Sequence, residues 1–394
     1  MKHRLLDHIV CPLDGTALEL VDWESRRLAV DDSARAKAEA LGVPVERLTH
    51  DVVTGLLLNR QRRIAYPIHD GVPRLLVFST GVAREFAQRH EARLRRELPE
   101  FDLPNGQAAP GEQDVLRTFS SEWIGYDWDG KAYWNLTPEA WFECMRFILD
   151  FERKPVTSKL VLEIGIGVGG VADHNSRAEG CELVGVDLGY AVDVAQRTFA
   201  STNPFLHVVQ ASAFMPPFRA ETFDMVYSFG VLHHTYSTKA AFDRVCKLPK
   251  RGGRLYIWVY SPYDEQRNLL RRVLMATEKA VRPLAWRLPE KLQSLLLAPL
   301  VPAYMGYQAL QVASGAKGRI PYSWREAMHA ARDRFTPRFV HRHTDDEVKG
   351  WFSEAGFAEL EASSERPRPT YVPIGFTACT GIAGTRGQLR RGAP

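Results

Sequence analysis

Residues 161–170 read VLEIGIGVGG, and this glycine-rich stretch decides the fold. It follows an apolar run and opens a stretch with helical character, which is the context of a nucleotide-binding loop. Read as G-x-G-x-x-G, its spacing cradles a dinucleotide pyrophosphate. Read as E-x-G-x-G-x-G, from Glu163 through Gly165 and Gly167 to Gly169, it wraps around S-adenosylmethionine.

Two carboxylates near the loop bear on this choice. Glu163 disfavours a pyrophosphate because like charges repel in a partly desolvated cleft, and it favours the ammonium of a methionine moiety. Asp187 ends the strand-like run CELVGVD some 20 residues downstream, where a carboxylate accepts both ribose hydroxyls. Asp187 therefore indicates a nucleoside but serves both cofactors equally.

The stretches that follow settle the choice. They read VVQASAFMPPFRAETFDMVYSFGVLHHT (208–235) and KLPKRGGRLYIWVY (247–260). From about Leu160 to Tyr260 the chain resembles class I S-adenosylmethionine-dependent methyltransferases, which carry an adenine-binding turn, an L-P-F segment, an F-D-x-V strand, an L-H-H sequence and an L-x-P-G-G turn in this order. The resemblance implies S-adenosylmethionine as the cofactor and a Rossmann-like, doubly wound, mostly parallel sheet.

The resemblance also implies a set of cofactor contacts. One position departs from the family, because Ser212 stands where an acidic residue is usual, so the adenine amine is expected to meet the Ser212 hydroxyl or nearby backbone groups. The expected cofactor-binding residues are Glu163, Gly165, Gly167, Gly169, Asp187, Leu188, Ser212, Ala213, Phe214, Ser228, Phe229 and Tyr126.

The rest of the chain fits an α/β class. Apolar runs such as FLHVVQAS and GRLYIWVY alternate with helical stretches, which indicates a parallel sheet covered by helices, and YVPIGFTAC is expected as the last strand. The expected boundaries are a small α+β N-terminal domain at 1–78, a helical linker at 79–112, the methyltransferase core at 113–261 and 336–385, a helical insertion at 262–335 and a tail at 386–394.

The N-terminal domain carries a second resemblance. C-P-x-x-x-G-x-L from Cys11 to Leu18 and Y-P-I-x-D-G-V-P from Tyr66 to Pro73 resemble a small zinc-ribbon-like domain that occurs alone or ahead of class I methyltransferases in bacteria. Its metal-binding members offer two C-x-x-C pairs. Here the first reads Cys11-Pro-Leu-Asp14, and four ligands are not available, so we expect a degenerate domain without metal and a buried Cys11.

Methyl transfer needs a base only if the acceptor must lose a proton. His233 and His234 follow the strand FDMVYSFG at the edge of the sheet where ligands bind in such folds, and they are the first candidate bases. His343 and His341 follow the insertion and are weaker candidates. Each of the four is alternatively a packed, capping or solvated histidine. Trp123, together with Tyr126, is expected either to close over the cofactor or to seal the N-terminal helices.

The insertion at 262–335 interrupts the alternation of strands and helices. It is expected to form a lid and pocket for the acceptor, although a basic amphipathic helix also suits a membrane surface or a dimer interface. The leading hypothesis is a methyltransferase acting on a small molecule with non-polar surface, such as a secondary metabolite or an envelope glycan or lipid precursor. The alternatives are an RNA or protein methyltransferase and a non-catalytic S-adenosylmethionine-binding subunit.

Composition limits the other possibilities. Across 394 residues the net charge is only +4, so nucleic acid is not expected as a partner. Five scattered cysteines indicate a reducing compartment. The N-terminus MKHRLLDHIV does not read as a secretory signal, and the longest apolar run, LLLAPLVPAYMGY, is shorter than the roughly 20 residues of a spanning helix. A cytoplasmic protein is expected, with an uncertain oligomeric state.

Overall fold

The computed structural model describes residues 1–124, 136–262, 269–315 and 318–387. Its N-terminal part is a four-stranded antiparallel sheet in the order β1-β2-β3-β4. Asp70 and Gly71, both with positive φ, form a tight turn between β3 and β4. The elements here are η1 (His3–Asp7), β1 (Glu19–Arg27), α1 (Asp32–Ala40), α2 (Val45–Thr49), β2 (His50–Asn59), β3 (Ile64–His69), β4 (Val72–Pro73), α3 (Gly81–Arg89) and α4 (Glu91–Glu97).

A larger seven-stranded sheet follows, in the order β10-β11-β9-β8-β5-β6-β7. Strands β5 to β9 pair in parallel, and only β11 runs antiparallel to its neighbours β9 and β10. The sheet is therefore mostly parallel, as the sequence predicts. Its strands are β5 (Leu160–Ile164), β6 (Glu182–Asp187), β7 (Leu206–Gln210), β8 (Phe223–Phe229), β9 (Pro249–Val259), β10 (Phe357–Ala362) and β11 (Thr380–Arg386).

Helices cover both faces of this sheet because alternate strand residues point to opposite sides. On β5, Leu162 and Ile164 join a core with α9, α15 and the N-terminal domain, whereas Val161 joins a second core with α6, α7 and α8. The helical elements are α5 (Glu112–Ile124), α6 (Pro138–Ile148), α7 (Gly170–Ala178), α8 (Ala191–Ala195), η2 (Gln196–Ala200), η3 (Leu232–His234), α9 (Thr238–Val245), α15 (Asp345–Glu354), η5 (Ser363–Glu365) and α16 (Ile374–Ala378).

The end of the chain corrects one prediction. YVPIGFTAC is not a strand: α16 occupies Ile374–Ala378, and the strand β11 begins at Thr380. Thr380 is the first residue to pair with β9, opposite Val259. Pro373 lies directly before α16, where its missing amide proton does no harm, and this explains why the apolar pattern misled the prediction.

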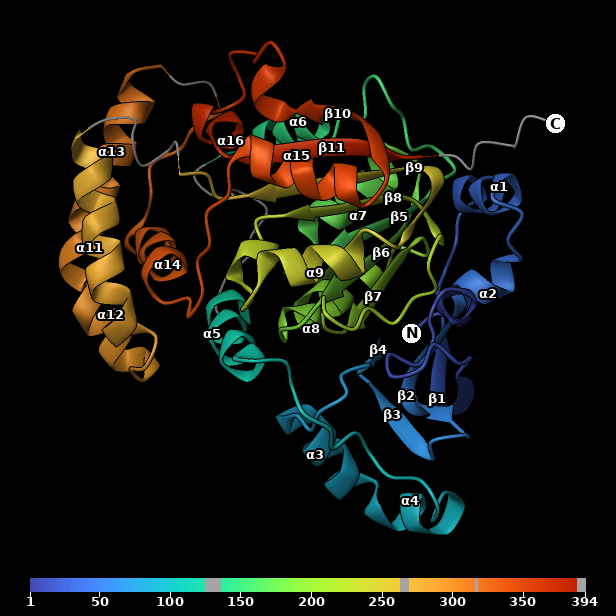
Figure 1. The fold of residues 1–394 in the computed structure, drawn as a ribbon. Helices are drawn as coiled ribbons and strands as arrows, with labels where there is room; N and C mark the ends of the chain where they lie inside the picture. The colour runs from blue at the N-terminus through green and yellow to red at the C-terminus, as the bar shows by residue number, and fades with distance from the viewer. Residues whose placement is uncertain (125–135, 263–268, 316–317, 388–394) are drawn as a thin grey trace.

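The insertion after β9 stands beside the sheet (Figure 1). Helix α14 lies between the sheet and the other three helices of the insertion, and each of these three contacts it. None of the described helices is long and apolar enough to cross a membrane. The elements are α11 (Leu269–Ala285), α12 (Glu290–Leu297), η4 (Ala298–Leu300), α13 (Val301–Ala313) and α14 (Trp324–Phe335).

The N-terminal domain and the large sheet form one packed body. Leu5, Ile9 and Tyr66 belong to the same buried apolar core as Leu162 and Val209 of the large sheet. The backbone also continues across the boundary, since the Leu75 amide donates to the Gln210 carbonyl at the edge strand β7 over 2.8 Å. The small domain thereby covers an edge that would otherwise present unpaired backbone groups.

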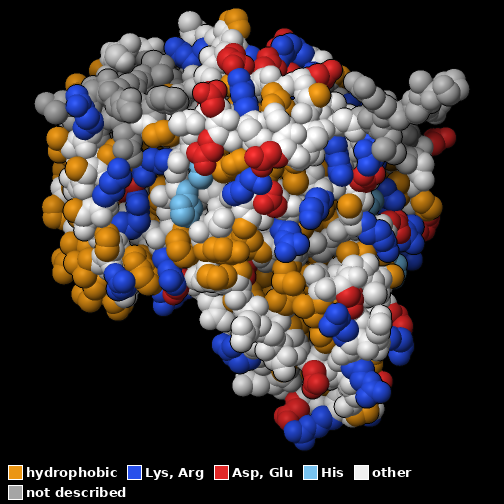
Figure 2. Space-filling model, viewed as in Figure 1, with side chains coloured by type: hydrophobic (Ala, Val, Ile, Leu, Met, Phe, Trp, Pro, Cys, Tyr) orange, Lys and Arg blue, Asp and Glu red, His pale blue; other side chains and the backbone are white. Residues whose placement is uncertain are grey.

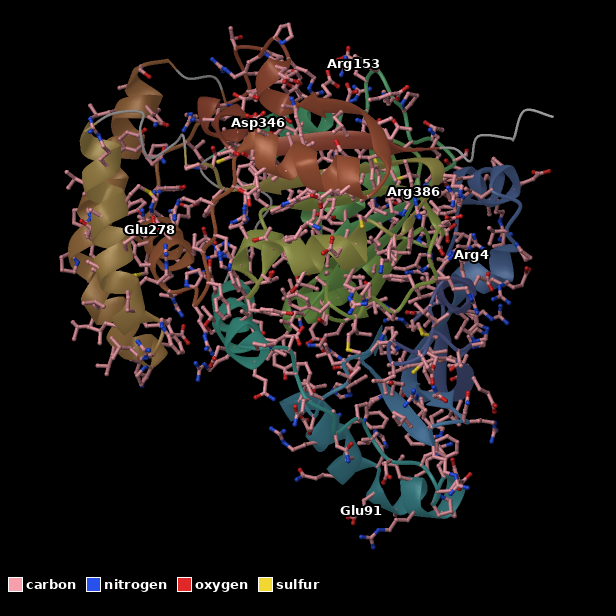
Figure 3. The ribbon with its side chains drawn as sticks, viewed as in Figure 1. Arg4, Glu91, Arg153, Glu278, Asp346 and Arg386 are labelled. Carbon is pink, nitrogen blue, oxygen red and sulfur yellow. The ribbon has the colours of Figure 1, made fainter. Side chains whose placement is uncertain are left out.

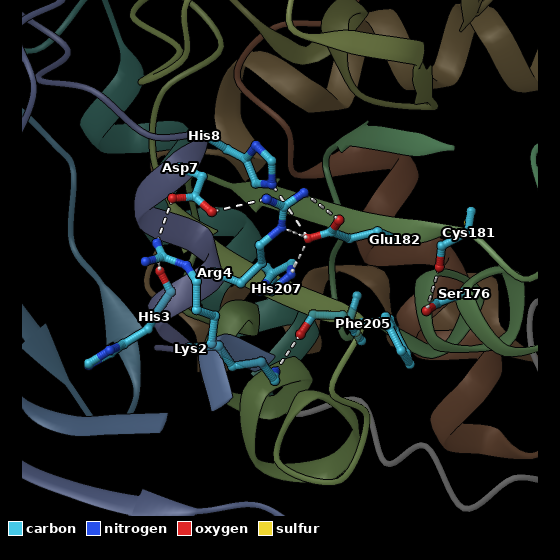
Figure 4. Close-up of polar contacts among 12 residues, drawn as sticks. Lys2, His3, Arg4, Asp7, His8, Ser176, Cys181, Glu182, Phe205 and His207 are labelled. Carbon is cyan, nitrogen blue, oxygen red and sulfur yellow. Dashed lines mark hydrogen bonds and ion pairs between the residues drawn. The ribbon is translucent and has the colours of Figure 1, made fainter. Parts of the chain in front are cut away.

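A buried carboxylate anchors this contact (Figure 4). Glu182, 1% exposed at the start of β6, accepts hydrogen bonds from Arg4 at 2.9 and 3.0 Å and from His207 at 3.0 Å. Burial alone would raise the pKa of Glu182, but the hydrogen bonds from His207, His8 and Arg4 outweigh burial and lower it. Lys2 adds hydrogen bonds to the carbonyls of Ala200 and Leu206.

Candidate functional site

The glycine-rich loop leaves β5 and enters α7 along a left-handed path. Gly165 has φ 89°, and a Cβ there would lie 2.1 Å from Val231. Gly169, at φ 87°, is the residue that caps α7. Both positions require glycine, because an L residue is strained at such angles and at Gly165 it would collide as well. The amide of Gly165 donates to the Val186 carbonyl at 2.7 Å, which holds the loop against β6.

Gly165 and Gly167 line a cavity with a volume of about 750 Å³ at the carboxyl ends of the parallel strands. This position is where open α/β sheets bind their ligands. A Cβ at Gly167 would meet no atom within 4 Å, so the loop backbone faces open space there. Gly169 does not line the cavity; it packs against Ala195 and shapes the start of α7.

Glu163 lines the same cavity although it is only 6% exposed. Its Oε2 accepts a hydrogen bond from the Tyr227 hydroxyl at 2.9 Å. Burial is the main reason why the pKa of Glu163 rises to about 8, and the nearby Asp187 raises it further. A carboxyl group that is neutral in the empty site and loses its proton when a cation binds suits an ammonium ligand.

Asp187 ends β6 and Leu188 follows it, and both line the cavity. The Asp187 carboxylate accepts hydrogen bonds from the amides of Gly167 at 2.9 Å and Gly189 at 2.8 Å. Burial raises its pKa, while these amides act against that shift. The aspartate is thus held in one orientation at the edge of the cavity, as a ribose acceptor requires.

The structure separates the three residues that are expected to meet the adenine. Ala213 and Phe214 line the large cavity, but Ser212 faces a smaller neighbouring cavity of about 270 Å³. The Ser212 hydroxyl accepts from the Phe214 amide at 3.1 Å and is hydrogen-bonded to Glu112 of α5. Glu112 lines both cavities and is 6% exposed. An acidic group therefore reaches this end from another helix, which sequence reasoning missed.

Of the remaining expected contacts, Phe229 lines the cavity and stacks on Trp258 with ring centroids 4.5 Å apart. Ser228 is fully buried behind the wall, and among the described residues its hydroxyl has no hydrogen-bond partner. Tyr126 lies outside the described residues. Trp123, at the end of α5, lines the cavity.

Only one of the candidate histidines reaches the cavity wall. His234 lines it, and its Nδ1 donates to the Phe339 carbonyl at 3.0 Å, which leaves Nε2 as an acceptor. Burial lowers the pKa of His234 to about 3, so the ring is neutral near pH 7. His233 is fully buried behind it, and His343 is bonded to Glu347 at 2.8 Å; neither lines the cavity. His341 does not line it either, and its Nε2 lies 3.0 Å from the Thr235 carbonyl.

The insertion brings an acidic pair to this wall that the sequence did not single out. Asp333 of α14 lines the cavity beside Tyr260, and it interacts with Glu122 of α5. Burial raises the pKa of both carboxyls, and the charge of Asp333 raises that of Glu122 further, whereas the hydrogen bond with Glu122 acts against the shift of Asp333. Two such carboxyls cannot both ionise easily, so they share a proton near neutrality.

The neighbouring arginines are already engaged. Arg334 contacts Glu278 at 3.0 Å, and Arg332 contacts Glu290 at 2.6 Å. Glu278 lies inside the insertion (Figure 3) and also receives Arg342 at 2.8 Å. Asp333 therefore lines the cavity while Arg334, whose charge lowers the pKa of Asp333, is bound to Glu278.

The far part of the cavity is built by the insertion and the chain after it. It combines aromatic rings with amide, hydroxyl and guanidinium groups. The residues that line it are Tyr307, Gln308, Gln311, Ser314, Arg319, Tyr322, Arg368, Thr370, Tyr371 and Phe376.

The N-terminal domain brings no second thiolate to Cys11. Cys11 is buried, and its Sγ lies 3.4 Å from the Tyr66 hydroxyl oxygen. The Asp14 carboxylate accepts hydrogen bonds from Asn59 and Arg62. Among the described residues, the group whose metal-binding atoms lie within 4.8 Å of one another is His3, Asp22 and His50 instead.

Comparison with known proteins agrees with this geometry. Residues 162–257 match the family described as methyltransferase domain, and residues 2–71 match the Trm112p-like protein family. Phosphoethanolamine N-methyltransferase 2 of Caenorhabditis elegans is 23% identical over 57% of this chain and 50% of its own length. Probable tRNA methyltransferase 9B of Mus musculus is 32% identical over 36% of this chain and 30% of its own.

A solved structure is similar at the level of the fold. Phosphoethanolamine N-methyltransferase 2 of Haemonchus contortus, in complex with phosphomonomethylethanolamine and S-adenosylhomocysteine, has a TM-score of 0.40 at 15% identity, covering 73% of this chain and 62% of that one. The chain thus spans about half the length of the first curated relative and less of the other.

The parallel sheet, the glycine loop with its acidic partners and the family matches define the class. Residues 162–257 form a methyltransferase domain on a mostly parallel sheet, and residues 2–71 form a Trm112p-like domain. S-adenosylmethionine is its cofactor, and the open backbone at Gly167, the buried Glu163 and the oriented Asp187 fit that molecule.

Proposed function

We propose that this protein transfers a methyl group from S-adenosylmethionine to a small molecule with substantial non-polar surface. One observation carries the proposal: a single cavity runs from the glycine loop to the aromatic wall of the insertion. The volume of about 750 Å³ lies in the range typical of small-molecule sites. An acceptor bound at Tyr307 and Tyr322 would therefore share one cavity with the cofactor.

The cofactor-binding roles follow from the contacts. Glu163 would hold the methionine ammonium, Asp187 the ribose hydroxyls, and Glu112 with the Ala213–Phe214 backbone the adenine amine. Phe229 and Trp123 would pack against the bound molecule. The cofactor supplies the electrophilic methyl on its sulfonium, so the protein mainly positions the acceptor and excludes water.

The acceptor atom would form its bond to the methyl carbon as the carbon–sulfur bond breaks, and any acceptor proton must leave to a base. Asp333 suits this role better than His234. A base works best when its pKa lies near the working pH, and burial moves the pKa of Asp333 upward toward neutrality but that of His234 down to about 3. His234 would then donate no proton from Nε2 and would instead orient the acceptor.

The second candidate function is methylation of RNA, which is favoured by the similarity to a probable tRNA methyltransferase. The net charge of only +4 and the aromatic cavity lined by the insertion favour a small-molecule acceptor over RNA.

Two measurements test the proposal. Calorimetry with S-adenosylmethionine and S-adenosylhomocysteine tests cofactor binding. Transfer of a labelled methyl group to separated small-molecule, lipid, RNA and protein fractions of a cell extract identifies the acceptor. Label in the RNA or protein fraction alone would refute a small-molecule acceptor, and cofactor binding without transfer to any fraction would favour a binding subunit.

A further inference from the structure

The outward side of the insertion is unusually apolar. Among the described residues, eight of the nine large hydrophobic side chains that are exposed lie on or beside its helices. We call this set the insertion patch: Val273, Leu284, Leu292, Leu295, Leu296, Tyr307, Leu310 and Trp324. The exposed fraction reaches 72% at Leu295 and 71% at Leu310. Soluble surfaces rarely gather apolar side chains in this way unless they meet a partner.

The helical repeat explains how the patch forms. On α11, Met275 and Glu278 face inward and are buried, whereas Val273, Ala280 and Leu284 are exposed on the other side. With 3.6 residues per turn, the last three share one stripe. Helix α11 therefore exposes an apolar stripe on the side opposite Met275 and Glu278.

Helices α12 and α13 repeat the arrangement. Leu292, Leu295 and Leu296 are exposed at i, i+3 and i+4 on α12, opposite the buried Leu297. The stretch VPAYMGYQALQVA of α13 contains no charged residue, although Leu310 and several of its neighbours are exposed. All three helices pack on α14, so their outer stripes point away from the protein core (Figure 1). The space-filling view shows apolar side chains gathered over this part of the molecule (Figure 2).

Most of the exposed charged side chains beside the insertion patch are basic. Between residues 269 and 313, the described side chains that are exposed and basic are Arg272, Lys279, Arg287 and Lys291. Glu290 is the one exposed acid in the same set, and it is paired with Arg332. Two copies of this surface facing each other would bring basic side chains together, which disfavours a symmetric dimer.

We propose that the insertion patch docks on an anionic lipid bilayer, with its leucines in the interface and its basic side chains at the headgroups. Apolar stripes flanked by Arg and Lys are the pattern of helices that lie on such surfaces. Tyr307 both lines the cavity and is 43% exposed, so the cavity reaches the surface next to the patch. A non-polar acceptor held in the bilayer would reach Tyr307 without crossing open water, an extension that rests on the proposed function.

Co-sedimentation tests the docking directly with the full chain. Vesicles of phosphatidylcholine with phosphatidylglycerol should bind the protein, vesicles of phosphatidylcholine alone should bind it less, and added salt should weaken binding. A Leu295→Glu/Leu310→Glu variant should lower the partition coefficient at least about tenfold, because two apolar anchors become charged. Arg272→Ser/Lys291→Ser should lower it about tenfold on anionic vesicles only.

The control is Ala36→Glu/Ala40→Glu, which makes the same charge change at exposed positions of α1 and should bind as the natural chain does. S-adenosylhomocysteine affinity, measured on every variant, separates lost docking from lost folding and from failure of the proposed function. Docking is overturned if the natural chain ignores anionic vesicles, or if the leucine variant binds them equally well. Docking is also overturned if light scattering shows that the natural chain is a dimer and that the Leu295→Glu/Leu310→Glu variant is a monomer.

Discussion

The amide of Gly167 donates a hydrogen bond of 2.9 Å to the carboxylate of Asp187. This bond joins the loop after β5 to the end of β6, so the residue that would meet the ribose also fixes the loop beside it. Gly189 binds the other oxygen of the same carboxylate. Cofactor affinity and loop geometry therefore depend on one side chain.

Asp187→Asn should weaken S-adenosylmethionine binding about tenfold or more. The amide keeps the shape but loses charge-assisted hydrogen bonds, which contribute about 1.5–3 kcal/mol. Calorimetry measures the change. Asp346→Asn, on the exposed side of α15 (Figure 3), is the matched control and should leave affinity unchanged. Equal affinities of both variants would remove Asp187 from the site.

Glu163 should make cofactor binding depend on pH. Its pKa of about 8 leaves it neutral at rest, and a cationic ligand favours the carboxylate, so affinity should fall about tenfold per pH unit below 8. Glu163→Gln should bind more weakly and flatten this dependence. Without ligand the sign reverses: the neutral carboxyl stabilises the fold at low pH, and this contribution is lost as the pH rises through about 8. Titration calorimetry from pH 6 to 9 checks the first trend and thermal unfolding the second.

Glu112 should replace the acidic group that Ser212 lacks. Glu112→Ala should weaken cofactor binding several-fold, because one hydrogen bond to the adenine amine is lost. Adding Ser212→Asp to that variant should recover part of the loss. A Glu112→Ala protein that remains folded and binds normally would restore the simpler view in which the backbone of Ala213 and Phe214 suffices.

The acceptor proton should leave to Asp333. Asp333→Asn should lower kcat about 10²-fold or more, whereas His234→Gln should lower it less than tenfold, and neither should change S-adenosylhomocysteine affinity. His343→Gln, away from the cavity, is the control. The rate of the natural protein should rise with pH as Asp333 and Glu122 ionise. Asp333→Asn should abolish this rise in the pH–rate profile. A larger defect in His234→Gln would return the role to the histidine.

The purified protein should hold no stoichiometric zinc at Cys11. One thiolate beside Tyr66 cannot form a four-ligand site. Elemental analysis of the natural chain, Cys11→Ser and His50→Gln tests this. Zinc lost from Cys11→Ser would contradict the prediction, and metal lost only from His50→Gln would point to the cluster with His3 and Asp22.

The sequence predicted what depends on neighbours along the chain. The loop at Gly165 and the strand that ends at Asp187 both follow from local patterns, and the structure has them where expected. Thr344 caps α15 through its side chain, and the Glu347 carboxylate binds His343.

What the sequence could not reveal is long-range assembly. Glu122 and Asp333 are 211 positions apart, and only the packing of α5 on α14 brings them together. Glu112 reaches Ser212 in the same way. The three carboxylates, Glu112, Glu122 and Asp333, lie outside the motifs quoted from the sequence, so the signal available was their presence on otherwise ordinary helices.

The contact between Arg4 and Glu182 has a consequence for how the protein behaves on dilution. Both residues belong to one polypeptide, so their encounter is governed by an effective concentration that short flexible tethers place near the millimolar range. Two separate chains joined by the same surface would part as their amounts fell. In this protein the Trm112p-like domain remains bound to the large sheet at any protein concentration. Because both domains belong to one polypeptide, they are always present in a one-to-one ratio.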